Sequence, residues 1–313
     1  MKLAKLLPSI RTRGMALLTA GAMLVTNAFG GNFFNSTVDG VNLGNANGGG
    51  SHLWAVFALS GGVSITDPGG FLNPWDVLGS VGVAGSGNLT MSASRIQGDF
   101  YKRTGASTTT SGGATITGTT YSSFIPTDVL LSQASADATN ASKAASAAAN
   151  NWIGVAPTTI AANNVAVNLA IAAVANTTYV LHLTDLILSG AGAVLTLSGN
   201  NQANVNYIVN INRYMSLSSG SKVVLTGGLQ PYNVLFNVQE STYSTFTYDA
   251  TLSGGSKIAD APYGGSGTLG GGVILAPNRT VKLTGASEVK GEVIGKAVSL
   301  SGNSRVYTPM VSP

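Results

Sequence analysis

The sequence has no cysteine and few charged residues. Only 9% of its 313 residues are Asp, Glu, Lys or Arg, against about 25% in an ordinary globular protein. Without cysteine, the chain has neither disulfides nor thiolate metal ligands. The scarcity of charge does not indicate disorder, because disordered segments combine high net charge with low hydrophobicity, and this chain is 44% hydrophobic. Its stability must therefore come from packing and hydrogen bonds.

Basic charge is also scarce once the N-terminus is set aside. Of the 16 basic residues, four lie in the first 28 residues, where no acid occurs: Lys2, Lys5, Arg11 and Arg13. The other 12 are balanced by 12 acidic residues. A nucleic-acid-binding protein needs a basic patch that displaces counterions from phosphates. The sequence therefore excludes nucleic acid as a partner.

Long apolar runs are absent too. The apolar stretch at residues 14–25 follows the basic N-terminus and is shorter than the roughly 20 residues that a spanning helix needs. Small residues follow it at Thr26 and Ala28, which is typical of a signal peptide. We therefore predict a signal peptide over residues 1–28 and a secreted or cell-surface protein, with no membrane span in the mature chain.

Glycine, by contrast, is abundant, with 41 residues, and some of these glycines close copies of one short repeated pattern. The pattern is an apolar residue, any residue, a second apolar residue, then Ser or Thr, usually followed by Gly. Copies begin at Leu89, Ala114, Leu186, Leu195, Met215, Val223, Val281 and Val298, with a degenerate copy at Thr251. Alternation of this kind is typical of a strand with one buried face. Each copy is predicted to be a short strand that ends at a Gly turn, which favours a β-solenoid over its main competitor, a sandwich or barrel.

One segment departs from the β pattern. Residues 127–151 contain no Gly or Pro. Alanines at the spacing of one helical face occur at Ala134, Ala138, Ala141, Ala145 and Ala148. We predict a helix over this segment that lies along the solenoid, with Leu130 or Leu131 fixing one end and Trp152 the other. Ser142 lies off the alanine stripe, so its replacement is expected to cost little.

Three stretches carry a resemblance to a known family. They are residues 76–118, Gln133–Ala138 and residues 272–306, in which Leu275–Asn278 and Gly291–Gly295 are the most specific parts. These stretches resemble exported bacterial β-solenoids related to ice-binding proteins, and the "choice-of-anchor" surface proteins. The resemblance implies a right-handed, discontinuous parallel β-solenoid of triangular section, with one long Ala-rich helix packed along a face, secreted or displayed by a bacterium. Only some members of the family bind ice.

The expected organisation is therefore mostly β, with one folded domain. The signal peptide, residues 1–28, precedes a single β-solenoid domain over residues 29–313. Within that domain we expect N-terminal rungs over residues 29–126, the flanking helix over residues 127–151, and C-terminal rungs over residues 152–313.

Candidate catalytic and metal-binding groups are few. The two histidines, His52 and His182, do not lie at a metal-ligand spacing from each other or from an acid. His182 is predicted to point away from Asp185 on its strand and to be held by a hydrogen bond. Glu288 and Glu292 form the nearest acidic pair, but the glycine between them predicts a turn that leaves both solvated. We therefore predict no catalytic site, no metal and no cofactor, and a polysaccharide-degrading β-helix enzyme is a remote alternative.

Hydroxyl side chains occur at fixed spacing on the predicted strands. Both outward positions of the pattern carry Ser or Thr at Thr90, Ser92, Thr115, Thr117, Thr196, Ser198, Ser216, Ser218, Ser299 and Ser301. Successive outward side chains on one strand are about 6.6–6.8 Å apart, and adjacent rungs are about 4.8 Å apart. Pairs stacked on one face would therefore form a flat, uncharged lattice of hydroxyls.

Two non-enzymatic functions are open on this sequence. One is binding of an extended surface, such as ice or polysaccharide, through these hydroxyls. The other is a structural or adhesive role in the cell envelope or extracellular matrix, with other envelope or matrix proteins as partners, in which Ser and Thr only provide solubility. A flat, charge-free face over several rungs favours the first. A face broken by Lys222, Lys257 or Lys282 favours the second.

Overall fold

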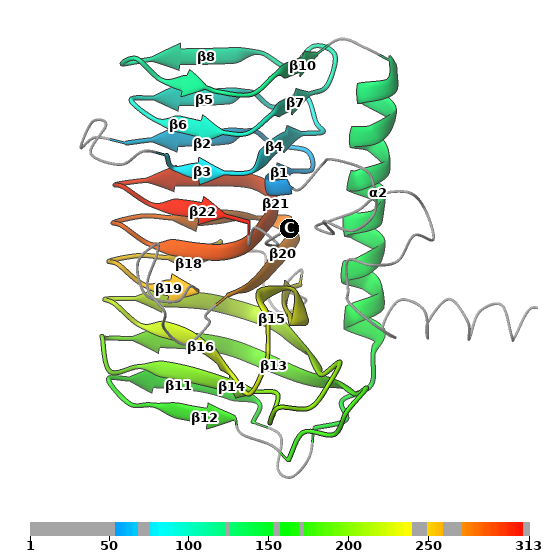
Figure 1. Cartoon of the computed structure of the whole chain (residues 1–313), viewed down its shortest axis with the longest axis vertical. Coiled ribbons are helices and arrows are strands. Elements are labelled where there is room, and N and C mark those ends of the chain that lie inside the picture. The colour runs from blue at the N-terminus through cyan, green and yellow to red at the C-terminus, as the bar shows by residue number, and fades with distance from the viewer. Residues whose placement is uncertain are drawn as a thin grey trace, which may run out of the picture.

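The computed structural model describes seven segments of the chain: residues 54–67, 75–122, 125–152, 157–169, 172–239, 249–258 and 271–308. In these segments, parallel strands stack into a β-solenoid, and one α-helix, α2 (Ile125–Ala147), runs along its length (Figure 1). No helix in the described part of the chain is long and apolar enough to cross a membrane. The predicted signal peptide, residues 1–28, and His52 lie outside the described residues.

The strands form three faces, which we name by what lies on them. The helix-covered face contains β10 (Thr120–Ser122), β7 (Phe100–Lys102), β4 (Ser80–Val83), β1 (Trp54–Ala58) and β17 (Val234–Val238). The hydroxyl face contains β8 (Thr108–Ser111), β5 (Leu89–Ser92), β2 (Val63–Thr66), β18 (Ala250–Leu252) and β11 (Thr159–Asn163). The charged face contains β9 (Thr115–Ile116), β6 (Arg95–Gln97), β3 (Val77–Leu78), β22 (Arg305–Tyr307), β19 (Lys257–Ile258), β16 (Lys222–Thr226), β14 (Val194–Ser198) and β12 (Val167–Leu169).

Four longer strands bend round a corner and contribute to more than one face. They are β13 (Thr178–Ser189), β15 (Asn206–Ser218), β20 (Gly272–Leu283) and β21 (Glu288–Ser301). A 3-10 turn, η1 (Pro231–Asn233), precedes β17. The pairing of β13 with β15 shifts register between Leu183 and Asp185, and a β-bulge of this kind bends a strand. The bend carries each strand from the helix-covered face to the hydroxyl face.

The repeated sequence pattern marks strands, but not always whole ones. The copies at Leu89 and Val223 are separate strands, β5 and β16, as predicted. The copies at Leu186, Met215, Val281 and Val298 are instead the ends of β13, β15, β20 and β21. The prediction that every copy is a short strand is wrong for these four, because a bulge turns the corner without ending the strand.

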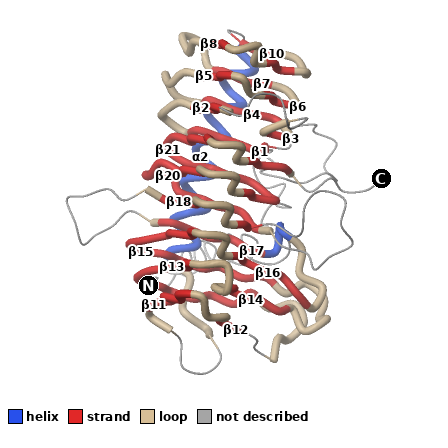
Figure 2. Tube along the Cα trace, turned by 90° about the vertical axis from the view of Figure 1, so that its left-hand side faces the viewer, coloured by secondary structure: helices blue, strands red, loops and turns tan. Residues whose placement is uncertain are grey.

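The rungs do not stack in chain order. β1 enters the middle of the stack, between β4 and β21, and the chain continues to β8, β9 and β10 at one end. Helix α2 then leads to β11 and β12 at the other end, and the chain returns until β21 and β22 pair with β1, β2 and β3. With 23 residues, α2 is about 35 Å long, close to the roughly 38 Å that nine stacked strands span. Figure 2 shows the helix running lengthwise along these layers.

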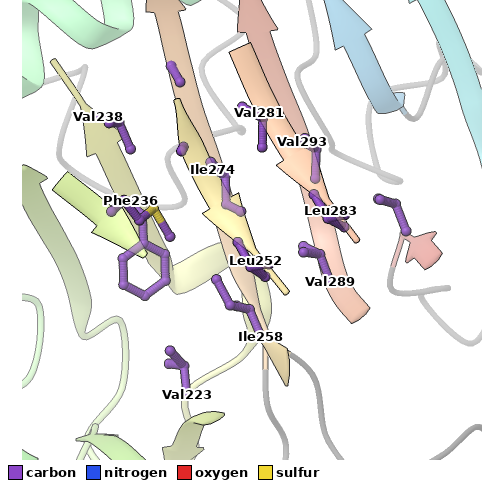
Figure 3. Close-up of a cluster of buried hydrophobic side chains, with 14 of the residues drawn as sticks. Val223, Phe236, Val238, Leu252, Ile258, Ile274, Val281, Leu283, Val289 and Val293 are labelled. Carbon is purple, nitrogen blue, oxygen red and sulfur yellow. The ribbon is translucent and has the colours of Figure 1, made fainter. Parts of the chain in front are cut away.

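Alternate residues of all three faces point inwards and form the core. Val223, Phe236, Leu252, Ile274 and Val289 are fully buried and converge from strands of every face (Figure 3). Burying an aliphatic or aromatic side chain of this size contributes about 1.5–3 kcal/mol. The core is therefore continuous along the stack, although each strand by itself is short.

Helix α2 packs its alanine stripe on the helix-covered face. All five predicted alanines contact this face, fully buried at Ala134, Ala138 and Ala145 and partly buried at Ala141 and Ala148. Leu131 is fully buried in the same cluster. Beyond the other end, Trp152 packs against Tyr207, with 6.2 Å between the ring centroids. The predicted docking of the helix is confirmed, with bounds of Ile125–Ala147 in place of residues 127–151.

Amides on the sheet hold the C-terminal half of α2. The side chain of Asn237 on β17 donates to the carbonyl oxygen of Ser142 at 3.1 Å and accepts from the Ser142 hydroxyl at 2.6 Å. Asn210 on β15 donates to the carbonyl oxygen of Ala145 at 2.7 Å, which lies in the last turn, where helix carbonyls lack intrahelical partners. The expectation that Ser142 matters little is contradicted, because Ser142 is buried against Asn237.

Candidate functional site

Outward side chains on the hydroxyl face form two columns that run along the stack. From β8 to β11 the first column is Thr109, Thr90, Ser64, Ser299, Lys282, Thr251, Ser216, Ile187 and Ala161. The second is Ser111, Ser92, Thr66, Ser301, Thr284, Ser253, Ser218, Ser189 and Asn163. The columns are about 6.6–6.8 Å apart and their members about 4.8 Å apart. Hydroxyls thus repeat regularly in two directions.

The structure divides the predicted hydroxyls between two faces. Six of them lie together in the two columns of the hydroxyl face: Thr90, Ser92, Ser216, Ser218, Ser299 and Ser301. The other four lie at the two ends of the charged face: Thr115, Thr117, Thr196 and Ser198. Thr115 stacks on Arg95, not on another hydroxyl. Alternation along a strand shows which residues point outwards, but the face depends on the corners before and after the strand.

Several members of the two columns were not among the hydroxyls predicted from the sequence. Ser64 and Thr66 occupy the outward positions of β2, where Asp67 follows them in place of the usual Gly. Thr109 and Ser111 belong to β8, whose inward positions are threonines instead of apolar residues. The first pair fits the pattern without its usual Gly, as the copy at Leu89 does, and could have been found in the same way. The second pair has no apolar signal, because β8 is the last strand of the stack and its inward side is exposed.

A row of buried serines fixes the corner between the hydroxyl face and the charged face. These serines are Ser94, Ser221, Ser256, Ser287 and Ser304, each at most 2% exposed. The hydroxyl of Ser304 donates to the carbonyl oxygen of Ser301 at 2.7 Å, and that of Ser287 to the carbonyl oxygen of Thr284 at 2.7 Å. Each therefore holds the backbone of an outward hydroxyl residue. The signal was present in the sequence, as a Ser two or three residues after the outward hydroxyl.

Glycines make the sharp turn between the outward hydroxyl and the buried serine. Gly285 and Gly302 both have φ of +62°, a conformation that a Cβ atom disfavours. The two turns stack directly, since the backbone N–H of Ala286 donates to the carbonyl oxygen of Gly302 at 2.5 Å. Corners in register keep the edge of the hydroxyl face straight from rung to rung.

Of the three lysines expected to favour a structural role, Lys282 does lie in the hydroxyl columns and breaks the first of them. Charge on the two columns is confined to this residue, whose Nζ lies 2.6 Å from Oδ2 of Asp249. Lys222 and Lys257 lie on the charged face instead, paired in register with each other. On one side of Lys282, the strands β8, β5, β2 and β21 carry only Ser and Thr in both columns. We call these residues the charge-free patch: Thr109, Ser111, Thr90, Ser92, Ser64, Thr66, Ser299 and Ser301.

The acidic residues considered for catalysis do not form a pair. Glu288 lies on the charged face, with Oε2 3.1 Å from Nζ of Lys257. Glu292 is buried on the helix-covered face, and burial raises its pKa well above the ordinary value. The prediction that both are solvated is wrong for Glu292, because β21 continues through Gly291 and carries the two side chains to different faces. Among the described residues, no group of three or more His, Cys, Asp or Glu could hold a metal ion.

His182 is held by a hydrogen bond, as predicted. Its Nε2 lies 2.8 Å from the carbonyl oxygen of Ala148 and donates to it. Asp185 instead accepts from Nε and Nη2 of Arg213 at 2.9 and 2.6 Å, and these hydrogen bonds hold the pKa of the carboxyl below its ordinary value. The two side chains therefore serve separate structural contacts.

Comparison with known proteins gives structural matches alone. No family model matches the sequence, and no curated protein matches it either. The crystal structure of a glycosylated ice-binding protein, LeIBP, from an Arctic yeast has a TM-score of 0.52 and 21% identity, covering 83% of this chain and 92% of that chain. A second LeIBP structure from an Arctic yeast has a TM-score of 0.50 and 19% identity over the same shares. The chain has the fold of these ice-binding proteins.

The ice-binding-protein fold confirms what the sequence resemblance implied about architecture. Parallel strands form a solenoid, the rungs stack out of chain order, and one Ala-rich helix lies along a face. A structural match at a sequence identity near 20% establishes a shared fold alone, and one fold can carry different functions. The ligand of this chain therefore depends on its own outward residues.

Proposed function

We propose that the protein binds ice and that the hydroxyl face makes the contact. The observation that carries this proposal is the charge-free patch, in which four consecutive strands present only Ser and Thr. A surface that repeats in two directions can make many weak hydrogen bonds and methyl contacts at once with a ligand that also repeats. The fold that the chain shares with ice-binding proteins supports the same function.

A lattice ligand requires an outward surface that is fixed before binding. Ile65, Met91 and Leu300 lie beneath the patch and are at most 1% exposed, so the strands cannot shift without disturbing a close-packed core. Ser and Thr side chains are short, and little rotamer entropy is lost when they are held at a surface. The patch is therefore preorganised for contact.

The other two faces are poorly suited to an uncharged lattice. Helix α2 covers one of them. The other carries a column of charged side chains formed by Lys222, Lys257, Glu288, Arg305 and Arg95. A charged group keeps its hydration shell and resists transfer to a surface that cannot solvate it. Of the three faces, the hydroxyl face is the one suited to ice.

The test is the ice activity of the purified chain without residues 1–28, measured as thermal hysteresis and as inhibition of ice recrystallisation. Thr90→Lys places a charge in the centre of the patch and should abolish both activities. Thr115→Lys makes the same change on the charged face, beside Arg95, and should leave them intact. Unchanged melting temperatures would show that both variants keep the fold.

An inactive wild-type chain would refute ice binding. Pull-downs with cellulose and chitin then distinguish the alternatives: retention on either one would identify a polysaccharide lattice as the ligand. If ice, cellulose and chitin all fail, the structural or adhesive role stands. The predicted signal peptide supports an extracellular site of action, where any of these surfaces would be accessible.

A further inference from the structure

The ion pair of Lys282 and Asp249 divides the hydroxyl face into two parts that differ in their outward residues. Lys282 occupies the first column between Ser299 and Thr251. The part towards β8 is the charge-free patch. The part towards β11 has hydroxyls in both columns on β18 and β15, but Ile187 and then Ala161 replace them in the first column.

Resting on the proposed function, we propose that ice contact is confined to the charge-free patch and that Lys282 is the residue that ends it. The Lys282 side chain is 47% exposed and longer than the Ser and Thr side chains around it, so a bulky charged group interrupts the row of hydroxyls. Its partner Asp249 is also partly exposed, so the pair stays hydrated. Pressing the pair against ice would strip that water without replacing its hydrogen bonds.

A second ion pair lies at the edge of the part of the hydroxyl face towards β11. Asp185 pairs with Arg213 where β13 and β15 enter the hydroxyl face. The Arg213 side chain is 43% exposed, and its guanidinium lies 5.0 Å from the centroid of the Tyr214 ring. From Lys282 towards β11 the face therefore carries two ion pairs with exposed cations, Lys282 and Arg213, whereas no residue of the charge-free patch is charged. Both observations place the contact on the same side of Lys282.

A matched pair of variants tests the boundary. Ser301 and Ser189 both occupy the second column, both end a long strand, and both precede a glycine with positive φ, +62° at Gly302 and +88° at Gly190. Ser301→Lys lies in the charge-free patch and should remove thermal hysteresis. Ser189→Lys lies beyond Lys282 and should keep the wild-type value. Equal loss in the two variants would overturn the boundary, since the whole face would then be in use.

The reverse change removes the boundary. Lys282→Thr combined with Asp249→Asn makes the first column a continuous row of hydroxyls from β8 to β15. Because added contacts on one rigid surface act together, thermal hysteresis should rise about twofold or more. The melting temperature should change little, since an exposed ion pair contributes about 0–1 kcal/mol. Hysteresis that stays at the wild-type value would overturn the role of Lys282.

The outcomes separate this inference from the proposed function. An inactive wild-type chain refutes both. An active wild type with equal loss in Ser301→Lys and Ser189→Lys refutes the boundary and leaves ice binding by the hydroxyl face standing. An active wild type that neither variant changes refutes the hydroxyl face as the contact, and the boundary with it.

Discussion

Glu292 is a buried carboxyl group on the helix-covered face, beside Val273 in the register of β20 and β21. It is 4% exposed, and its Oε2 has no hydrogen-bond partner within the part of the chain that the structure describes. Burial raises its pKa in the folded state, so the folded protein keeps a proton that the unfolded chain releases near the ordinary pKa. The free energy of unfolding should therefore fall as the pH rises from that ordinary value to the raised one.

Replacement of this carboxyl group tests the linkage. Glu292→Gln keeps the shape without a titrating group, and should remove a slope of at most about 1.4 kcal/mol per pH unit from denaturant unfolding followed between pH 5 and 8. Glu288→Gln is the control, because Glu288 lies on the same strand but pairs with Lys257 on the charged face. If both variants kept the wild-type pH profile, Glu292 would not be the group responsible.

At the scale of elements, the docking of α2 depends on small side chains at the contact. Ala138 is fully buried against the sheet, whereas Asn140, two residues on, is exposed. Ala138→Leu should destabilise the protein by about 1–3 kcal/mol, because the larger side chain forces the helix away from the sheet. Asn140→Leu places the same side chain in solvent and should have little effect. Equal shifts of the denaturation midpoint would contradict the close packing of this helix.

The two ends of the stack are closed by polar groups. At one end, Thr108 and Thr110 take the inward positions of β8 and are exposed. At the other, the Asn151 side chain donates to the carbonyl oxygen of Thr178 at 2.8 Å and accepts from the backbone N–H of Val180 at 2.7 Å. The Asn151 amide thus takes hydrogen bonds on β13 that the backbone of a further strand would otherwise make. Polar closure of this kind discourages other chains from pairing with an exposed strand edge.

At the scale of the whole molecule, the chain order makes β21 the strand that joins the two halves of the stack. It pairs with β20 on one side and with β1 and β2 on the other. Among the described strands, β10 pairs with β7 alone and β11 with β13 alone, because these two strands lie at the ends of the stack. Solenoid stability is a sum of contacts between neighbouring rungs, so local opening should start at the ends. Native-state hydrogen exchange should be slowest in β21 and fastest in β10 and β11. Uniform protection along the stack would contradict this prediction.

The sequence by itself determined the class of fold and the docking face of the helix. Alternation around Leu89 and Val223 identifies strands because the side-chain period of a strand is two, and the spacing of the alanines identifies the buried side of α2 because the helical period is 3.6. Both signals are local. They depend on a few neighbouring residues and not on how distant parts of the chain are arranged.

Only the tertiary structure decided which hydroxyls lie together. Thr90 and Thr115 follow the same pattern, yet the first stacks on Ser64 and the second on Arg95. Each strand is assigned to a face by the turns and bulges that precede it, and its neighbours come from rungs that are distant in sequence, as when Ser299 stacks on Ser64. Local alternation contains no information about corners or stacking order, so the charge-free patch and its boundary at Lys282 emerge only when the rungs are assembled.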